Sequence, residues 1–311
     1  MNVNTVKRGS VIRYNDKHHI PKNGVVTDET IICPNHWVFN YATGCKFDCQ
    51  YCYLHSKPQL RPHGGIKPHL KNERITAMDL KFMLKDLEKQ TMFHSGELSD
   101  SLVQENSLIR DIVPIFNGQR VNEVTNPNGH KLLIVTKDKT NKLIEGSHSQ
   151  RRVVMSYSLT AKQIGLDYEI NVPHVWERIR AAKRALALGY EVRLRIDPIM
   201  PINRWDLGFK ELIERIMVEI PGISRVTLGC IVATKEIVSS CNKQNNDLSW
   251  KDYCTEEGLV PKEKRKELYD YIITLLEDNG YERDIGLCKE PVEVWESIGL
   301  DWTEPKCNCI L

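Results

Sequence analysis

The chain has 311 residues, of which 41% are hydrophobic and 27% charged, and its formal net charge is +2; this composition is typical of a globular protein and neither requires nor excludes a nucleic-acid partner. No apolar run approaches the ~20 residues that span a bilayer, and the first residues lack the apolar core of a signal peptide. Ten cysteines in such a chain favour a reducing compartment and metal binding over disulfides, so we expect a cytoplasmic protein without a membrane partner.

Strand-like and helix-like patterns alternate along the chain. Short apolar runs rich in β-branched residues predict six strands, and amphipathic runs predict helices. Gly189 is expected to end the clearest helix, and Asp206 is expected to cap the next one. The predicted strands cover residues 37–41, 92–95, 131–136, 153–159, 191–197 and 225–230, and the clearest helices cover 175–188, 206–220 and 264–276.

This alternation predicts an α/β fold in which helices cover a parallel sheet. Six strands suit a partial (β/α)6 barrel of the TIM type, and reactive groups in such folds gather at the C-terminal strand ends. We expect an N-terminal extension over residues 1–30, the partial barrel over 31–235, and a helical segment with a cysteine-containing tail over 236–311.

Three cysteines, Cys45, Cys49 and Cys52, follow the first predicted strand with C-x3-C-x2-C spacing. Three thiolates on one loop can hold three irons of a [4Fe–4S] cluster and leave the fourth iron open. Clusters that only carry electrons usually have four cysteine ligands, so an open iron indicates a cluster that binds a molecule itself. The alternative is a zinc loop, but zinc sites commonly pair two C-x2-C-like knuckles and no second knuckle follows nearby.

With Gly44 before the first cysteine and Tyr51 before the third, this motif resembles the cluster loop of the radical S-adenosylmethionine (SAM) enzymes. The resemblance implies a partial barrel as the fold. It implies that the open iron binds the amino and carboxylate groups of SAM, and that one electron cleaves SAM to methionine and a 5′-deoxyadenosyl radical. It also implies an electron donor such as flavodoxin or ferredoxin.

The segment 93–100, at the end of the second predicted strand, resembles the element that accepts hydrogen bonds from the SAM amino group in that family. The resemblance implies SAM contacts at Gly96, Glu97 and Ser99. The alternative is that Ser99 or Asp100 caps a helix that begins near Ser101.

Two strand residues, Ser156 and Arg195, are further candidates for cofactor binding. Arg195 and Arg193 alternate on one strand face. Two arginines that point into a barrel need anionic partners, such as a SAM carboxylate or a phosphate. The alternative is that both guanidinium groups extend to water at a helix edge.

Residues 44–54, 95–100 and 176–201 together resemble spore photoproduct lyase and the DNA repair photolyase-like radical SAM proteins, over roughly residues 30 to 230. The resemblance implies a lyase or modification enzyme whose radical abstracts hydrogen from a nucleobase in DNA or RNA, with Tyr51 and Tyr53 in catalysis. In that family a cysteine returns a hydrogen atom to the product. Gly96 or Glu97 stands where this cysteine is expected, which favours a relative with another substrate.

The segment 57–74 is a candidate for contact with a phosphate backbone, because it is basic and follows the cysteine loop. A solvated basic loop is the alternative, since the aromatic residues typical of single-strand binding are absent there. Two other functions stay open: a radical SAM enzyme that modifies a peptide or small molecule, and a non-catalytic iron–sulfur or zinc protein that binds nucleic acid. The basic residues are Lys57, Arg61, Lys67, Lys71 and Arg74, with His63 and His69 as further donors.

Three cysteines, Cys288, Cys307 and Cys309, lie close together near the end of the chain. A Cys-x-Cys pair with one or two further cysteines can bind a second iron–sulfur cluster or a zinc ion. The alternative is a set of buried or surface thiols without a metal.

Overall fold

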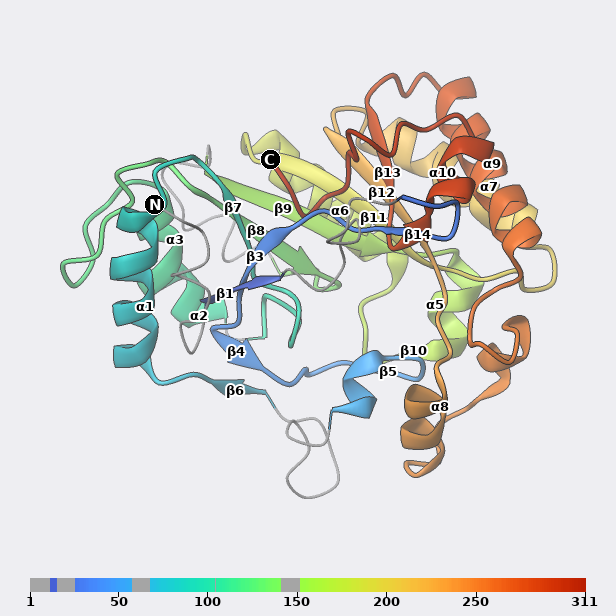
Figure 1. Ribbon diagram of the computed structural model, residues 1–311, viewed down its shortest axis with the longest axis horizontal. Coiled ribbons are helices and arrows are strands. Elements are labelled where there is room, and N and C mark those ends of the chain that lie inside the picture. The colour runs from blue at the N-terminus through green and yellow to red at the C-terminus, as the bar shows by residue number, and fades with distance from the viewer. Residues whose placement is uncertain (1–11, 16–25, 58–67, 104, 141–151) are drawn as a thin grey trace.

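The computed structural model describes residues 12–15, 26–57, 68–103, 105–140 and 152–311. In this part of the chain the largest sheet has eight strands in the order β1-β3-β7-β8-β9-β11-β12-β13 (Figure 1). The neighbours from β3 to β13 pair in parallel, and β1 pairs antiparallel with β3. The strands are β1 (Ile12–Asn15), β3 (His36–Phe39), β7 (Met92–His94), β8 (Lys131–Thr136), β9 (Val153–Leu159), β11 (Glu191–Ile199), β12 (Arg225–Cys230) and β13 (Asp284–Leu287).

The predicted α/β partial barrel is confirmed. Each of the six predicted strands is present, because each is an apolar run that becomes buried inside the sheet. Two strands were not predicted. The edge strand β1 and the seventh parallel strand β13 have four residues each and carry too few apolar residues to give a pattern.

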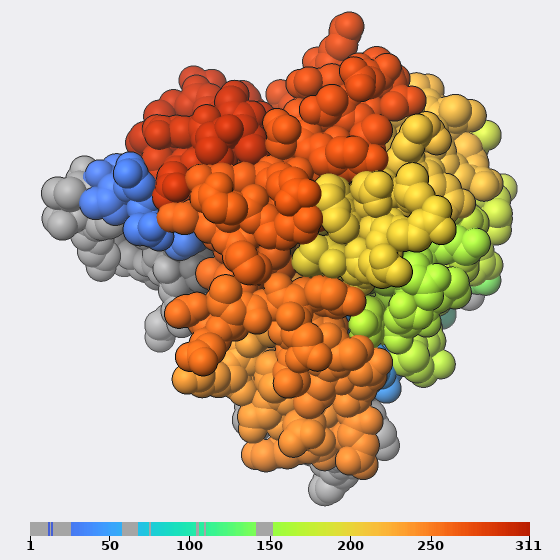
Figure 2. Space-filling view, turned by 90° about the vertical axis from the view of Figure 1, so that its right-hand side faces the viewer, coloured from blue at the N-terminus to red at the C-terminus, as the bar shows by residue number. Residues whose placement is uncertain are grey.

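The helices lie beside the sheet. α6 (Val175–Ala187) packs on β9 and β11, and α7 (Trp205–Glu219) packs on α9 (Lys262–Asp278). Gly189 ends α6 with a positive φ of 85°, as predicted. Asp206 is not the cap of α7: Arg204 occupies that position with a φ of 56°, and Asp206 lies in the first turn. Figure 2 shows the side of the molecule that α7, α8 (Lys235–Asn242) and α9 form, coloured yellow to orange.

The remaining described elements are short, apart from one helix. Helix α1 (Glu73–Asp86) and α3 (Val113–Phe116) lie toward the β1 edge of the sheet (Figure 1). No helix in the described ranges combines the length and apolar content that a membrane crossing requires. The others are α2 (Glu105–Ser107), α5 (Lys162–Tyr168), α10 (Val292–Ser297), the π-helix η4 (Leu108–Ile112), and the 3-10 helices η2 (Tyr53–Ser56) and η5 (Ser249–Tyr253).

Three two-stranded ribbons tie distant segments together. β4 (Ala42–Thr43) pairs with β6 (His69–Leu70), and β5 (Asp48–Cys49) pairs with β10 (Glu169–Ile170). β2 (Ile31–Ile32) pairs with β14 (Glu290–Pro291). The first ribbon holds the start of the cysteine loop, the second contains its middle cysteine, Cys49, and the third brings the N-terminal part of the chain to the segment after β13.

The C-terminal tail lies on the inner face of the sheet, which we define as the face that carries Ser156, Arg193, Arg195 and Thr227. Arg193 and Arg225 donate hydrogen bonds to the main-chain carbonyls of tail residues 307–311. Each of these arginines lies near the start of its strand. The tail therefore fills the inner face at the N-terminal half of the strands and leaves their C-terminal ends to other residues.

Candidate functional site

The cysteine loop leaves β4 at the C-terminal edge of the sheet. Gly44 begins it with a φ of 79°, a conformation that favours glycine, and donates a hydrogen bond from its main-chain N–H to the carbonyl of Leu98. Cys52 N–H donates to the Cys49 carbonyl over 3.1 Å, which closes a tight turn between the second and third cysteines. The loop thus gathers three thiols and lies against the turn that follows β7.

The three thiols of this loop lie close enough to act on one another electrostatically. Burial raises the pKa of Cys45 to about 12, with a smaller contribution from Asp100. Burial also raises the pKa of Cys49 well above its usual value, and the nearby Lys137 ammonium opposes this shift. Thiols that are buried together gain a stable charged form only with a metal beside them, so this donor set fits an iron–sulfur cluster.

A buried network of charges holds the loop in place. The Glu169 carboxylate, at the start of β10 and opposite Cys49 in the β5–β10 ribbon, pairs with Lys137 and Arg178 and accepts a hydrogen bond from the Tyr51 hydroxyl at 2.6 Å. Lys137 also donates to Tyr51 Oη at 2.8 Å. Burial would raise the pKa of Glu169, but the two cations outweigh it and hold that pKa at about 2. The network is therefore ionised and joins the loop to β8, β9 and α6.

The two tyrosines that the sequence assigns to catalysis have different surroundings. Burial and the Glu169 carboxylate raise the pKa of Tyr51 well above its usual value, so its phenol stays protonated and donates to Glu169. Tyr53, at the start of η2, is 42% exposed. Tyr51 is thus part of the buried network, whereas Tyr53 is exposed at the start of η2.

The turn 95–100 follows β7 and faces the cysteine loop. Asp100 accepts hydrogen bonds from the main-chain N–H groups of Leu102 and Lys137 and from the Thr136 hydroxyl. Asp100 therefore holds the turn against β8. The alternative that Ser99 or Asp100 caps a helix near Ser101 is wrong, because residues 101–103 form turns and the next described helix is α2. A Cβ on Gly96 would lie 2.7 Å from the Val135 Cβ, so the turn approaches β8 as closely as only glycine allows.

Several polar atoms around Glu97 lack hydrogen-bond partners. The Glu97 carboxylate is 3.5 Å from the Asn40 side-chain nitrogen. In the described part of the chain, buried Asn40 Oδ1, His94 Nδ1 and Ser99 Oγ have no partner. Unsatisfied buried polar atoms cost about 1–3 kcal/mol each, so this group fits a polar ligand with an ammonium and a carboxylate, as SAM has. The structure thus brings Glu97 and Ser99 of the predicted set together and adds Asn40 and His94.

The other two predicted cofactor residues contact the C-terminal tail. Ser156 accepts a hydrogen bond from the Asn308 side chain at 3.0 Å. Arg195 donates to Cys288 Sγ at 3.6 Å and to Cys309 Sγ at 3.3 Å. The inward direction of Arg195 agrees with the prediction from strand alternation, but its hydrogen-bond partners in the structure are thiols and not the carboxylate or phosphate that was expected.

A further cysteine, Cys33, joins the C-terminal cysteines in this region. Burial raises the pKa of Cys33 to about 12, and Cys288 and Cys309 raise it further, so the three thiols are close neighbours. Sequence reasoning missed Cys33, because it stands alone in the chain and only the β2–β14 ribbon brings it here. No set of three His, Cys, Asp or Glu side chains is arranged around a single metal ion within the described ranges, and this includes both the loop and the tail cysteines.

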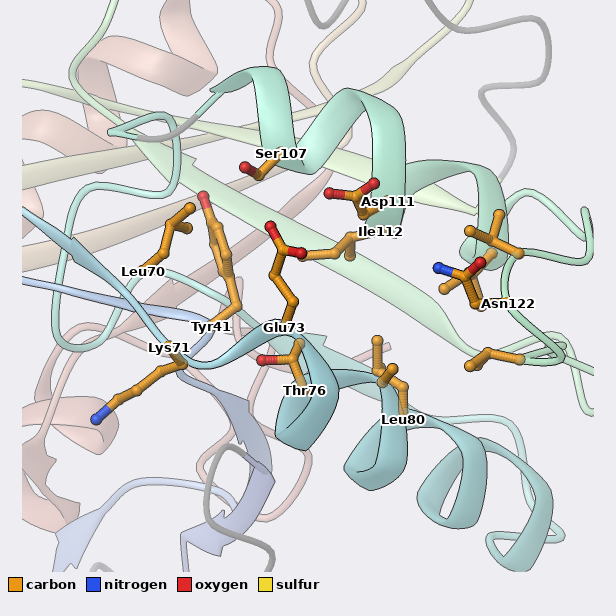
Figure 3. Close-up of a pocket in the computed structure, with 14 residues that line it drawn as sticks. Tyr41, Leu70, Lys71, Glu73, Thr76, Leu80, Ser107, Asp111, Ile112 and Asn122 are labelled. Carbon is orange, nitrogen blue, oxygen red and sulfur yellow. The ribbon is translucent and has the colours of Figure 1, made fainter.

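Figure 3 shows a pocket that lies away from these residues. It has a volume of about 90 Å³ and lies between β6, α1 and the π-helix η4, with Tyr41, Thr76 and Asp111 among its lining residues. None of the predicted cluster, SAM-contact or catalytic residues lines it, but Lys71 of the basic segment does. Of the basic segment, Arg61, His63 and Lys67 lie outside the described residues, whereas Lys71 and Arg74 are exposed beside β6 and at the start of α1.

Comparisons of the sequence with known proteins agree on one family. A family model described as spore photoproduct lyase matches residues 29–269. The spore photoproduct lyase of Bacillus subtilis (strain 168) is 24% identical over 182 residues, which cover 58% of this chain and 51% of that protein. The chain spans about half the length of the curated relatives that it matches.

Solved structures share the fold. A spore photoproduct lyase variant with bound AdoMet and dinucleoside spore photoproduct superposes with a TM-score of 0.66 at 19% identity, over 80% of this chain and 75% of that chain. Streptococcus suis SuiB bound to S-adenosylmethionine has a TM-score of 0.51 at 12% identity, over 84% of this chain and 52% of that chain. At these identities the likeness shows the partial barrel alone.

Proposed function

Because this chain belongs to the spore photoproduct lyase family of radical SAM proteins, we propose that it is a radical SAM enzyme that acts on a nucleobase of DNA or RNA. The observation that carries the proposal is the cysteine loop, which faces the Glu97 turn at the C-terminal edge of the sheet. Family membership favours an enzyme over a non-catalytic binding protein.

Cys45, Cys49 and Cys52 would hold the [4Fe–4S] cluster, and the open iron would bind SAM. When bound, the reduced cluster supplies the electron that cleaves SAM to methionine and a 5′-deoxyadenosyl radical, which abstracts hydrogen from the substrate. Glu97 would accept hydrogen bonds from the SAM ammonium, with Asn40 and Ser99 as further polar partners.

The buried network around Glu169 keeps the cysteine loop in one position. Lys137 places a positive charge beside Cys49, and the Tyr51 hydroxyl is hydrogen-bonded to both Lys137 and the Glu169 carboxylate. A loop fixed by side chains that are themselves ion-paired and hydrogen-bonded holds its ligands in a reproducible geometry. We assign Tyr51, Lys137 and Glu169 positioning roles on this basis.

Two observations support a nucleic-acid substrate. A solved structure with this fold holds a dinucleoside spore photoproduct, and exposed Lys71 and Arg74 stand at the β4–β6 ribbon, next to the start of the cysteine loop. Gly96 and Glu97 provide no thiol where the family resemblance expects one. We therefore propose a base lesion or modification other than the spore photoproduct itself.

Transfer of deuterium from a labelled base to 5′-deoxyadenosine tests this proposal. Reconstituted protein is reduced with SAM in the presence of base-deuterated DNA or RNA, and the mass of the deoxyadenosine is measured. We expect deuterium in the deoxyadenosine with at least one nucleic acid. Deoxyadenosine that forms without deuterium from any nucleic acid would contradict the substrate and favour the peptide or small-molecule alternative.

Neutralising the two exposed basic residues provides a second readout. The double variant Lys71→Gln with Arg74→Gln should weaken oligonucleotide binding and reduce its salt dependence by about one to two phosphate contacts. Lys85→Gln, at the exposed end of α1, is the matched control. Equal salt dependence in all three proteins would contradict a phosphate contact at this ribbon.

A further inference from the structure

Four cysteines from three distant parts of the chain meet on the inner face of the sheet. Arg195 Nη1 lies 3.6 Å from Cys288 Sγ, and Nη2 of the same guanidinium lies 3.3 Å from Cys309 Sγ. Cys307 is hydrogen-bonded to Cys309, and Cys33 interacts electrostatically with Cys288 and Cys309. These four thiols come from segments other than the cysteine loop, which carries Cys45, Cys49 and Cys52.

Main-chain hydrogen bonds place Cys33 and Cys288 in this group. The antiparallel β2–β14 ribbon pairs Ile32 with Glu290, so Cys33 and Cys288 both lie just beyond the same end of this ribbon. The Cys288 N–H donates to the Leu228 carbonyl at the end of β12 over 2.8 Å. Thiols that only fill space need no such mutual approach.

Asn308 fixes the tail between its two cysteines. Its main-chain N–H donates to the Thr227 hydroxyl at 2.8 Å, and its side chain donates to Ser156 and to the Leu194 carbonyl. The tail also depends on Gly286, because a Cβ there would lie 2.6 Å from the Lys306 carbonyl oxygen. The Cys307 and Cys309 thiols are thereby held in a fixed position along the strands on the inner face.

Polar atoms around the four thiols lack partners. In the described part of the chain, buried Arg195 Nε and Asn308 Oδ1 have none. The hydrogen-bond partners of the Arg195 guanidinium are the two sulfurs, with Asp197 acting on it at longer range. A buried cation needs compensating negative charge, and a metal cluster with four thiolate ligands carries net negative charge.

We propose that Cys33, Cys288, Cys307 and Cys309 bind a second iron–sulfur cluster on the inner face of the sheet, next to Arg195. The four thiols are the complete ligand set of such a cluster, so none of its irons is left open for SAM. An iron–sulfur cluster fits better than zinc, because these side chains do not surround a single ion and the ligands of a cluster stand farther apart. The Arg195 guanidinium then donates its hydrogen bonds to the cysteine sulfurs and offsets the charge of the cluster.

Iron counting in the whole protein tests this site independently of catalysis. After anaerobic reconstitution, the triple variant Cys45→Ser, Cys49→Ser, Cys52→Ser should keep about half of the iron and sulfide of the wild type. The reduced triple variant should give an electron paramagnetic resonance signal that SAM does not change. Adding Cys288→Ser and Cys309→Ser to it should remove the remaining iron.

Two variants separate ligand loss from misfolding. Cys33→Ser changes a ligand outside the tail and should also remove the residual iron from the triple variant. Cys241→Ser with Cys254→Ser changes two cysteines in the α8–η5 region and should leave the iron count unchanged. Circular dichroism and thermal unfolding confirm that each protein is folded.

A triple variant without iron would overturn the proposal, and so would residual iron that persists without Cys288 and Cys309. Zinc in place of iron would overturn it as well. These outcomes are distinct from failure of the proposed function, since wild-type protein that holds both clusters and cleaves no SAM would refute only the enzymatic role.

Discussion

The buried Glu169 carboxylate offers a direct test of the network that holds the cysteine loop. The variant Glu169→Gln removes one negative charge and leaves Lys137 and Arg178 buried without it. A carboxyl whose pKa lies at about 2 in the folded protein, against an ordinary value of 4.5, contributes about 3 kcal/mol to folding at neutral pH. Removal of one partner from a buried ion pair typically costs about 3–5 kcal/mol, so we expect the variant to lose about 3 kcal/mol.

The pH dependence of this difference has a definite sign. Because folding lowers the pKa of Glu169, its contribution is complete above the unfolded pKa of about 4.5 and is lost as the pH falls towards about 2. The free energies of unfolding of wild type and variant should therefore differ most at pH 7, and their difference should shrink below about pH 4.5 and nearly vanish near pH 2.

Urea unfolding of the metal-free proteins measures both the loss of stability in the variant and its dependence on pH, because the free energy of unfolding in water is extrapolated at each pH. Glu211→Gln, which changes an exposed carboxylate on α7, is the matched control and should differ from the wild type by less than about 0.5 kcal/mol. A loss below about 1 kcal/mol for Glu169→Gln, or a loss that is the same at pH 7 and pH 3, would refute the reasoning.

Three further predictions concern the cofactors. Lys137→Met should lower the reduction potential of the loop cluster, because it removes a positive charge beside Cys49. A redox titration followed by electron paramagnetic resonance measures this potential, with Lys139→Met at an exposed position as the control. An unchanged potential in Lys137→Met would contradict the prediction. Gly96→Ala should weaken SAM binding about tenfold and leave the iron content unchanged, since the new Cβ collides with the Val135 side chain. Calorimetry measures the SAM affinity, and Gly165→Ala is the control, because the atom nearest to a Cβ at that position is 3.5 Å away. Glu97→Gln should weaken SAM binding by a similar factor, and an affinity within twofold of the wild type would exclude Glu97 as a contact.

Local sequence patterns predicted what depends on neighbouring residues. The six strands are apolar runs, and the spacing of Cys45, Cys49 and Cys52 reports a single loop. Helix α1 was not predicted, because its first turn contains Glu73 and Arg74 and continues the charge pattern of the preceding segment. Charge patterns of this kind do not show where a solvated loop gives way to a helix.

Contacts between distant residues were beyond the reach of local patterns. Glu169 approaches Cys49 only because two short strands, β5 and β10, pair across the molecule. Lys137 and Arg178 join that carboxylate from β8 and α6, and no spacing in the sequence relates the three. The inward direction of Arg195 followed from strand alternation, but its thiol partners depend on the tail, whose path is set by Gly286, Thr227 and Asn308.

Cleavage of SAM by the reduced protein tests the central claim most directly. Cluster-loaded wild type, reduced with dithionite, should convert SAM to equal amounts of methionine and 5′-deoxyadenosine. The Cys45→Ser, Cys49→Ser, Cys52→Ser variant should form neither, although it remains folded. Wild-type protein with a reduced loop cluster and bound SAM that forms no deoxyadenosine would contradict the assignment of this chain as a radical SAM enzyme.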